Sequence, residues 1–426
     1  MTALVLSGLL LLTGCRYGDH WPGRPPRPPR PPKPSPSATA TPSPSATASP
    51  TATPTATPSE TPNATPGPPE QVTLPAALPA ATGLQPIGTS PAPPPGSTGG
   101  VVALTPDGHF VVWERRHDTS DDAGNRTRYP SRIGIAPPGG AATWFRPEPA
   151  DPAQLRLVTT GDADGDWVVW REEPFRELPG DAVLFSYDRA TGAVVELARV
   201  TGTTLQPPVI VGDRVYWEQS SVTPEANGIW SAPLAGGTPR VEVADGSEVT
   251  ADRCGAEPAL LYATTAADGS ATDVHRRTAS GDTTVLTRTL GRGLPVLGLT
   301  GCGGDVAVAT GRAGALDLPE WAEGRVLVQD AGGAAVELAL PIGFTGREVV
   351  LGERLLGFVT VPHSLFGAQD QVLFDRTTHV ASSLGANGPG DVLQTSAVRL
   401  ADADVVSWVG VVNLTFLRGT AAGYVG

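Results

Sequence analysis

A short turn followed by an apolar strand that reaches an aromatic or small residue recurs along most of the chain. The clearest copies read DGHFVVWE at 107–114, DGDWVVWRE at 164–172 and GDRVYWEQ at 212–219, and weaker copies lie at 257–264, 305–311, 352–359 and 402–410. The aligned column holds Trp113, Trp170, Trp217, Tyr262, Ala309, Gly357 and Trp408, at spacings of 45 to 57 residues. A period of this length is typical of the four-stranded blade of a β-propeller.

The third copy shows the repeating unit in most detail. PVIV at 208–211 and RVYWEQ at 214–219 flank a Gly-Asp turn, and after a polar loop GIWSAPL at 228–234 and PRVEVAD at 239–245 flank an Ala-Gly-Gly turn. This is a succession of four short strands with suitable turn residues. No segment shows a capped apolar pattern of 3.6-residue period, which favours an all-β fold. A pair of β-sandwiches with coincidental turns is the alternative.

The pattern therefore predicts an all-β propeller over residues 99–426 with seven four-stranded blades. The last copy is too short for a complete blade, so six blades are possible if this copy only closes the ring. A strand from before Val101, near residues 71–74, would complete the last blade, and such closure removes exposed strand edges.

The segment ALTPDGHFVVWE at 103–114 resembles the blade-starting segment of TolB-like propellers, which has the form xPDGxxVVW. The other copies keep the turn and the apolar strand but lack the proline. The resemblance extends over the repeats through short motifs only. It implies the fold rather than a function, because one fold serves many activities.

The N-terminal segment has the features of an export signal. Residues 3–12 form an apolar run that is too short to cross a bilayer of ~30 Å and has the length of a signal-peptide core. The following Leu12-Thr13-Gly14-Cys15 resembles the lipobox of bacterial lipoproteins. That resemblance implies cleavage after residue 14, a lipid on Cys15, and a chain anchored on the extracytoplasmic face of the cell membrane. A cysteine placed there by chance is the alternative.

Residues 16–98 are rich in Pro, Ser, Thr and Ala, a composition that buries too little apolar area to fold. They predict a disordered tether, which at ~3.1 Å per residue would reach on the order of 200 Å. Basic residues recur at every third position in its first part, which places them along one edge of a polyproline helix. They are Arg24, Arg27, Arg30 and Lys33. Such a row is attracted to anionic lipid head groups; a solvated linker is the alternative.

The formal charge of the chain is −13. The first 34 residues hold five basic residues against Asp19 alone, so the remaining residues carry −17. This argues against nucleic acid as a partner, because phosphate binding needs a basic surface.

Cys254 and Cys302 remain once Cys15 is modified, and an oxidising compartment favours a disulfide between them. They fall in the first-hairpin region of adjacent repeats, 48 residues apart. The sequence thus predicts a disulfide between blades four and five.

The loop after the aromatic strand is long in several repeats. In four-stranded blades these loops all emerge on one face, and variable loops on a rigid scaffold commonly carry binding sites. The candidate binding residues are Arg115, Arg116, His117, Asp118, Glu172, Phe175, Arg176, Asp317, Trp321 and His363. Ordinary solvated loops are the alternative for each of them.

Asp162, Asp164 and Asp166 have the alternation of a calcium loop but lack its distal glutamate. Aspartate and glycine also simply form turns, so this is a weak calcium candidate and no metal or cofactor is predicted.

No GxSxG, HExxH or P-loop motif is present, and no catalytic residue is assigned. The sequence favours a binding or scaffold module for an unknown protein or envelope glycan. The alternatives are a propeller hydrolase or lyase that uses paired carboxylates on cell-envelope or environmental polysaccharide, and a spacer without a ligand.

Overall fold

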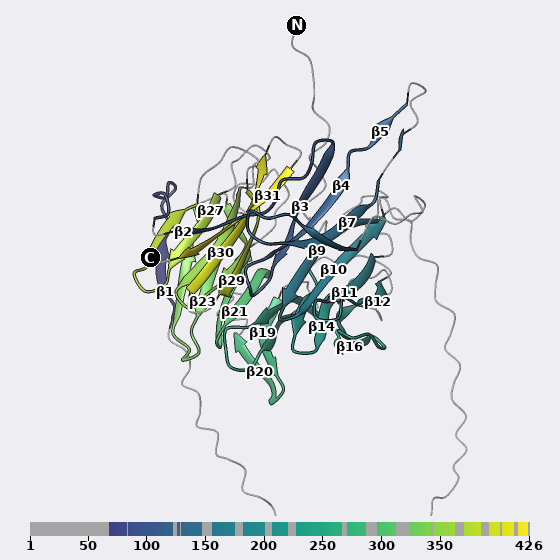
Figure 1. Ribbon diagram of the computed structural model, residues 1–426. Coiled ribbons are helices and arrows are strands. Elements are labelled where there is room, and N and C mark those ends of the chain that lie inside the picture. The colour runs from purple at the N-terminus through teal and green to yellow at the C-terminus, as the bar shows by residue number, and fades with distance from the viewer. Residues whose placement is uncertain are drawn as a thin grey trace, which may run out of the picture. The chain divides into compact units, whose positions relative to one another are not determined.

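The computed structural model describes residues 68–424 apart from short internal gaps (Figure 1). The gaps are residues 83, 122–125, 128, 147–155, 175–181, 201–206, 220–226, 266–270, 287–295, 312–323, 342–343, 363–369, 385–391, 401–402 and 413–415. The signal segment, Cys15 and the basic row Arg24, Arg27, Arg30 and Lys33 lie outside the described residues, so their roles stay predictions. Within the described ranges every regular element is a strand, and no helix could cross a membrane.

The strands form seven four-stranded blades, as the repeat predicted. Blade one contains β3 (Ser97–Leu104), β4 (Phe110–Arg116), β7 (Ser131–Ala136) and β8 (Thr143–Arg146). Blade two contains β9 (Arg156–Asp164), β10 (Trp167–Pro174), β11 (Ala182–Asp188) and β12 (Val194–Val200). Blade three contains β13 (Val209–Val211), β14 (Arg214–Gln219), β15 (Gly228–Pro233) and β16 (Arg240–Val243), which are the four strands read from the third repeat.

The remaining blades repeat this order. Blade four contains β17 (Gly246–Asp252), β18 (Ala259–Thr265), β19 (Ala271–Thr278) and β20 (Gly281–Leu286). Blade five contains β21 (Val296–Cys302), β22 (Asp305–Gly311), β23 (Gly324–Gln329) and β24 (Ala335–Ala339). Blade six contains β25 (Phe344–Leu351), β26 (Leu355–Pro362), β27 (Asp370–Asp375) and β28 (Val380–Ser383). Blade seven contains β29 (Val392–Leu400), β30 (Ala403–Val412), β31 (Phe416–Tyr424) and, from the other end of the chain, β2 (Leu84–Thr89).

The first strands of successive blades contact one another in order, and β29 contacts β3, so the blades close into a ring. Neighbouring strands within each blade are antiparallel, whereas β17 and β21 pair in parallel at Asp252 and Gly301. The first strands of the blades therefore run in the same direction. The connections between second and third strands lie on one face, here named the loop face. The connections between first and second and between third and fourth strands lie on the opposite face, the turn face.

The closing strand is not the one expected. β2 pairs antiparallel with β31 and completes blade seven. Residues 71–74, which the sequence favoured for this role, belong to or follow β1 (Glu70–Thr73), which pairs in parallel with β24 as a fifth strand of blade five. The segment assigned to the tether thus supplies two strands, and the boundary placed at residue 99 falls inside β3.

The hydrophobic core lies between the faces of adjacent blades. Between blades one and two, Ile133 and Trp170 are fully buried and pack with Phe185. Between blades two and three, Trp217 packs with Leu184 and Ile210. The alternating apolar residues of the second strands supply these contacts, which is why the tryptophan column was visible in the sequence.

Candidate functional site

On the loop face, blade one carries a long hairpin, the arm, formed by residues 115–130 with β5 (Thr119–Ser120) paired to β6 (Arg126–Thr127). Figure 1 shows β5 extending beyond the end of β4. The arm joins the second and third strands of blade one, so it holds the first group of sequence candidates. Antiparallel pairing of β4 with β7 continues to Arg115 and Ser131, which gives the arm a rigid base.

The four candidates at the base of the arm differ in exposure. Arg115 and Asp118 are largely buried and pair with each other, with 2.8 Å from Nη1 to Oδ1. Arg116 and His117 are exposed, and the Arg116 guanidinium lies 4.6 Å from the centre of the Tyr129 ring. The backbone N–H of His117 donates to the Gly96 carbonyl oxygen at 2.8 Å, which ties the arm to the start of blade one. Arg116 and His117 are therefore the candidates whose side chains face solvent.

Glu172 does not present its carboxylate to solvent. Its side chain is 6% exposed, and both oxygens are engaged by Arg146: Nε lies 2.5 Å from Oε1 and Nη2 lies 2.9 Å from Oε2. The Trp170 indole N–H also donates to Oε1 at 2.9 Å. The Arg146 guanidinium stacks on Phe185 at 3.8 Å. Glu172 thus links blades one and two. Its buried charge is paired and hydrogen-bonded, as buried charges in proteins normally are.

The contact between Arg146 and Glu172 can be tested by substitution. Glu172→Gln keeps the volume but leaves the Arg146 charge without a carboxylate, and we expect the free energy of unfolding to fall by about 1.5–3 kcal/mol, the range for hydrogen bonds to charged groups. Denaturant titration measures this loss. The matched control is Glu196→Gln, which breaks an exposed pair with Arg199 and should change stability by less than about 1 kcal/mol. Equal effects of the two variants would contradict the structural role of Glu172.

Other charged side chains at the loop ends of blades one and two are also paired. Arg132 meets Glu114 at 3.0 Å and stacks on Trp144 at 4.0 Å. Arg171 meets Glu173 at 2.9 Å, and burial lowers the pKa of Arg171 against the effect of that carboxylate. The carboxylates described on this part of the loop face are therefore held by arginines.

The remaining candidates fall in the gaps. Phe175 and Arg176 connect β10 to β11, Asp317 and Trp321 connect β22 to β23, and His363 connects β26 to β27. Each lies outside the described residues. That these five side chains share one face with the arm therefore stays a prediction.

Two of the three aspartates of the calcium candidate, Asp162 and Asp164, face an arginine, whereas Asp166 is exposed. Arg253 follows β17 and extends to blade two, where Nη1 lies 3.0 Å from Asp162 Oδ1 and Nε lies 3.5 Å from Asp164 Oδ2. Asp162 also accepts the backbone N–H of Ile210 at 2.7 Å, and Arg253 donates to the Ile210 carbonyl at 2.8 Å. The ion pair and its hydrogen bonds to the Ile210 backbone therefore join the first strands of blades two, three and four.

Charge and burial compete at this pair. Burial works against the charge of Arg253, but Asp162 and Asp164 outweigh it and raise the Arg253 pKa. Burial raises the pKa of Asp164, against the attraction of Arg253. The Arg253 guanidinium thus pairs with two of the three carboxylates that the calcium interpretation used as ligands. Among the described residues no group of three or more His, Cys, Asp or Glu could hold a metal ion.

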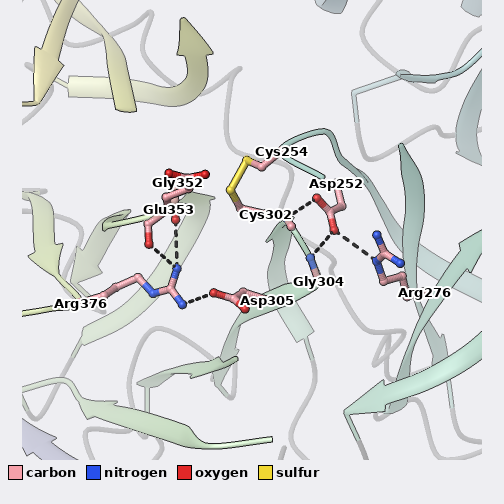
Figure 2. Close-up of a disulfide and its surroundings, with 10 residues drawn as sticks. Asp252, Cys254, Arg276, Cys302, Gly304, Asp305, Gly352, Glu353 and Arg376 are labelled. Carbon is pink, nitrogen blue, oxygen red and sulfur yellow. Dashed lines mark hydrogen bonds and ion pairs between the residues drawn. A yellow bond between two sulfur atoms is a disulfide. The ribbon is translucent and has the colours of Figure 1, made fainter. Parts of the chain in front are cut away.

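The predicted disulfide is present between Cys254 and Cys302, with Cα atoms 4.7 Å apart, and it joins blades four and five (Figure 2). Beside it, the fully buried carboxylate of Asp252 accepts the backbone N–H groups of Gly303 at 2.8 Å and Gly304 at 3.0 Å. Gly303 and Gly304 have φ of 67° and 100°, a left-handed conformation that glycine adopts without strain. The turn of blade five is thus held by blade four both covalently and through Asp252.

A second kind of contact between blades, an arginine in a third-to-fourth turn paired with an aspartate of the preceding blade, was not predicted from the sequence. Arg376, in the turn between β27 and β28, donates to the carbonyls of Gly352 at 3.0 Å and Glu353 at 2.9 Å in its own blade and pairs with Asp305 of blade five (Figure 2). In blade two, Arg189 likewise reaches Asp107 of blade one at 2.7 Å.

The signal for this device is the recurrence of Asp-Arg-x-Thr at 188–191 and 375–378. The aspartate of each copy accepts backbone N–H groups within its own turn. Burial opposes the charge of Asp375, but hydrogen bonds from Arg354 and the Thr377 and Thr378 backbone hold its pKa at about 2. A search for repeats on the third-to-fourth turns, and not only on the second strands, would have found it.

Neither a family model nor a curated protein matches this sequence. Solved structures match it through the fold. A prolyl endopeptidase matches with a TM-score of 0.47 and 13% identity, over 76% of this chain and 46% of that chain. The β-propeller domain of the Trilobed protease from Pyrococcus furiosus matches with 0.48 and 6%, over 78% and 98%. The putative TolB from Agrobacterium tumefaciens matches with 0.39 and 13%, over 60% and 89%.

This chain spans less than half the length of the prolyl endopeptidase and almost the whole length of the separate propeller domain. The similarity carries no information on activity. The ring of blades in its own strand order makes the protein a β-propeller.

Proposed function

We propose that the protein is a lipid-anchored extracytoplasmic binding module. Cys15 carries the lipid, residues 16 to about 69 form the tether, and the loop face of the propeller binds a protein or envelope glycan. The exposed side chains of the arm, Arg116 and His117, take part in this binding. No catalytic step is assigned.

The observation that carries the proposal is the place where the chain enters the ring. β1 pairs in parallel with β24, whose first residue follows the turn at Asp330–Ala334 on the turn face. Glu70, the first residue of β1, meets His379 of another turn on the same face, with 3.1 Å between Oε1 and Nδ1. The chain therefore enters on the turn face, opposite the arm. A tether that begins there leaves the loop face accessible to a partner.

The chemistry of the described loop face supports binding over catalysis. The carboxylates of Glu114, Glu172 and Glu173 are each paired with an arginine. A carboxylate whose oxygens are bound by a guanidinium is already engaged and is not free to contact a substrate. The exposed Arg116, stacked on Tyr129, suits recognition, because arginine and aromatic residues are common at binding hot spots.

Site-specific photocrosslinking in intact cells tests the proposal. A benzophenone amino acid at His117, on the loop face, should capture a partner, while the same group at Ala190, exposed on the turn face, should not. Full-length protein with Cys15→Ser should lose both lipid labelling and membrane retention. Identical products from the two positions, or no product from His117, would contradict loop-face binding. Lipid labelling that persists in the Cys15→Ser protein would contradict the anchor.

A further inference from the structure

Residues 70–82, here named the strap, attach to two blades before the ring-closing strand begins. In blade five, β1 pairs residue by residue with Val336 to Ala339, and the Leu74 N–H donates to the Ala339 carbonyl at 3.0 Å. Leu74 is 5% exposed and belongs to the cluster that contains Val326, Leu338 and Phe358, against which Val72 also packs. The first half of the strap is thus held by backbone bonds and by the core.

The second half of the strap is held by blade six. The Ala81 N–H donates to the Ser383 carbonyl at 2.7 Å, and the Ser383 N–H donates to the Pro79 carbonyl at 2.7 Å. Leu78 packs against the same apolar cluster as Leu74, and Ala81 packs against Leu355 and Leu373. The strap therefore covers the outer edges of β24 and β28 in turn.

Only after these two attachments does β2 begin and complete blade seven. Tension that enters the chain before Glu70 must break both attachments before it reaches β2. β1 lies lengthwise along β24, with its entry end on the turn face. The hydrogen bonds between the two parallel strands cross the strand axis at even spacing. A pull along β1 therefore loads these bonds together rather than one after another.

We propose that the strap is a mechanical clamp that isolates ring closure from tension on the tether. Without it, tension would act directly on β2, the strand whose release opens the ring. Ring closure does not need a fifth strand on blade five. Resistance to tension on the tether gives this strand a role in an anchored propeller. The inference rests on the tether of the proposed function, but its mechanics do not depend on lipidation.

Single-molecule pulling on two handles tests the clamp in an otherwise native ring. Both proteins carry Cys15→Ser, so that one engineered thiol is the only free thiol beside the Cys254–Cys302 disulfide. One protein carries Pro68→Cys, before the strap, and the other carries Thr82→Cys, at its end; both positions are exposed. The second handle, an alkyne amino acid at the exposed Arg199, lies near the loop-face end of β12 in blade two and is the same in both, so that the pull at residue 68 has a component along β1.

We expect ring opening at a higher force when the pull is applied at residue 68 than at residue 82. The opening event releases the same length of closing strand in both proteins, and the pull at residue 68 releases the strap in addition. Equal opening forces, or release of the strap at a force below that of ring opening, would overturn the proposal. Loss of lipid labelling would be a separate result that touches only the proposed anchor.

Discussion

Replacement of both disulfide cysteines, as Cys254→Ser with Cys302→Ala, should lower the free energy of unfolding by up to about 4 kcal/mol. The bond closes a loop of 48 residues, and the chain-entropy model gives that value for a loop of this length. Alanine is chosen at position 302 because this side chain is 3% exposed, and a buried hydroxyl would add its own cost. Denaturant unfolding followed by tryptophan fluorescence measures the change.

The control is the unmodified protein treated with a reductant, which should lose the same stability as the double variant. The double variant itself should not respond to reductant. If reduction leaves the midpoint of unfolding unchanged, the bond contributes nothing and Asp252 alone holds the turn of blade five.

Trp170→Ala should destabilise the protein by about 3–5 kcal/mol, the range for truncation of a buried tryptophan. Trp170 is fully buried between blades one and two, stacks on Phe185 with 5.4 Å between ring centres, and donates its indole N–H to Glu172. The variant therefore creates a cavity and removes a donor from a buried carboxylate. Thermal and denaturant unfolding both measure the loss.

Trp170→Phe separates the two contributions, because it keeps most of the apolar volume and removes only the N–H. We expect a loss intermediate between the native protein and Trp170→Ala. Trp144→Ala is the comparison on the other side of blade one, where the side chain is partly exposed, and its loss should be smaller. A Trp170→Ala protein as stable as Trp144→Ala would mean that this interblade core is not tightly packed.

The repeat was visible in the sequence because burial imposes it. Where their side chains are described, the second strands pack on both neighbouring blades, so their apolar residues are constrained, and Trp113, Trp170 and Trp217 occupy the same place in β4, β10 and β14. The disulfide followed from the same alignment, since equivalent turns of adjacent blades lie side by side. Local pattern was sufficient for these features.

The closing strand could not be identified in this way. Residues 71–74 have the better strand composition, whereas β2 contains Pro86, which argues against a strand in the interior of a sheet. β2 is the outermost strand of its blade, however, and an edge strand tolerates proline because one row of its N–H groups has no partner in the sheet. Which of two N-terminal segments pairs with which blade is decided by contacts hundreds of residues apart, and no local signal contains them.

The candidate site shows the same limit. The sequence placed Glu172 on the binding face because it follows an aromatic strand, but its neighbour in space, Arg146, comes from another blade. The alternation of Asp162, Asp164 and Asp166 suggested a calcium loop, but Arg253, which pairs with the first two, comes from two blades further along. Side chains at blade ends acquire their partners from adjacent repeats, and a single sequence does not show those partners.

The pairing of β2 with β31 also dictates the order in which the chain can fold. The four core strands of each of blades one to six come from continuous sequence, but blade seven joins an early strand to the last three, so the ring stays open until the C-terminal strands are available. β24 is available earlier, and β1 can dock on it as soon as blade five has formed. Once β1 has docked, β2 is separated from blade five by only a short stretch of chain. This shortens the search of β2 for β31 and limits the time that the unpaired edge of β31 is exposed.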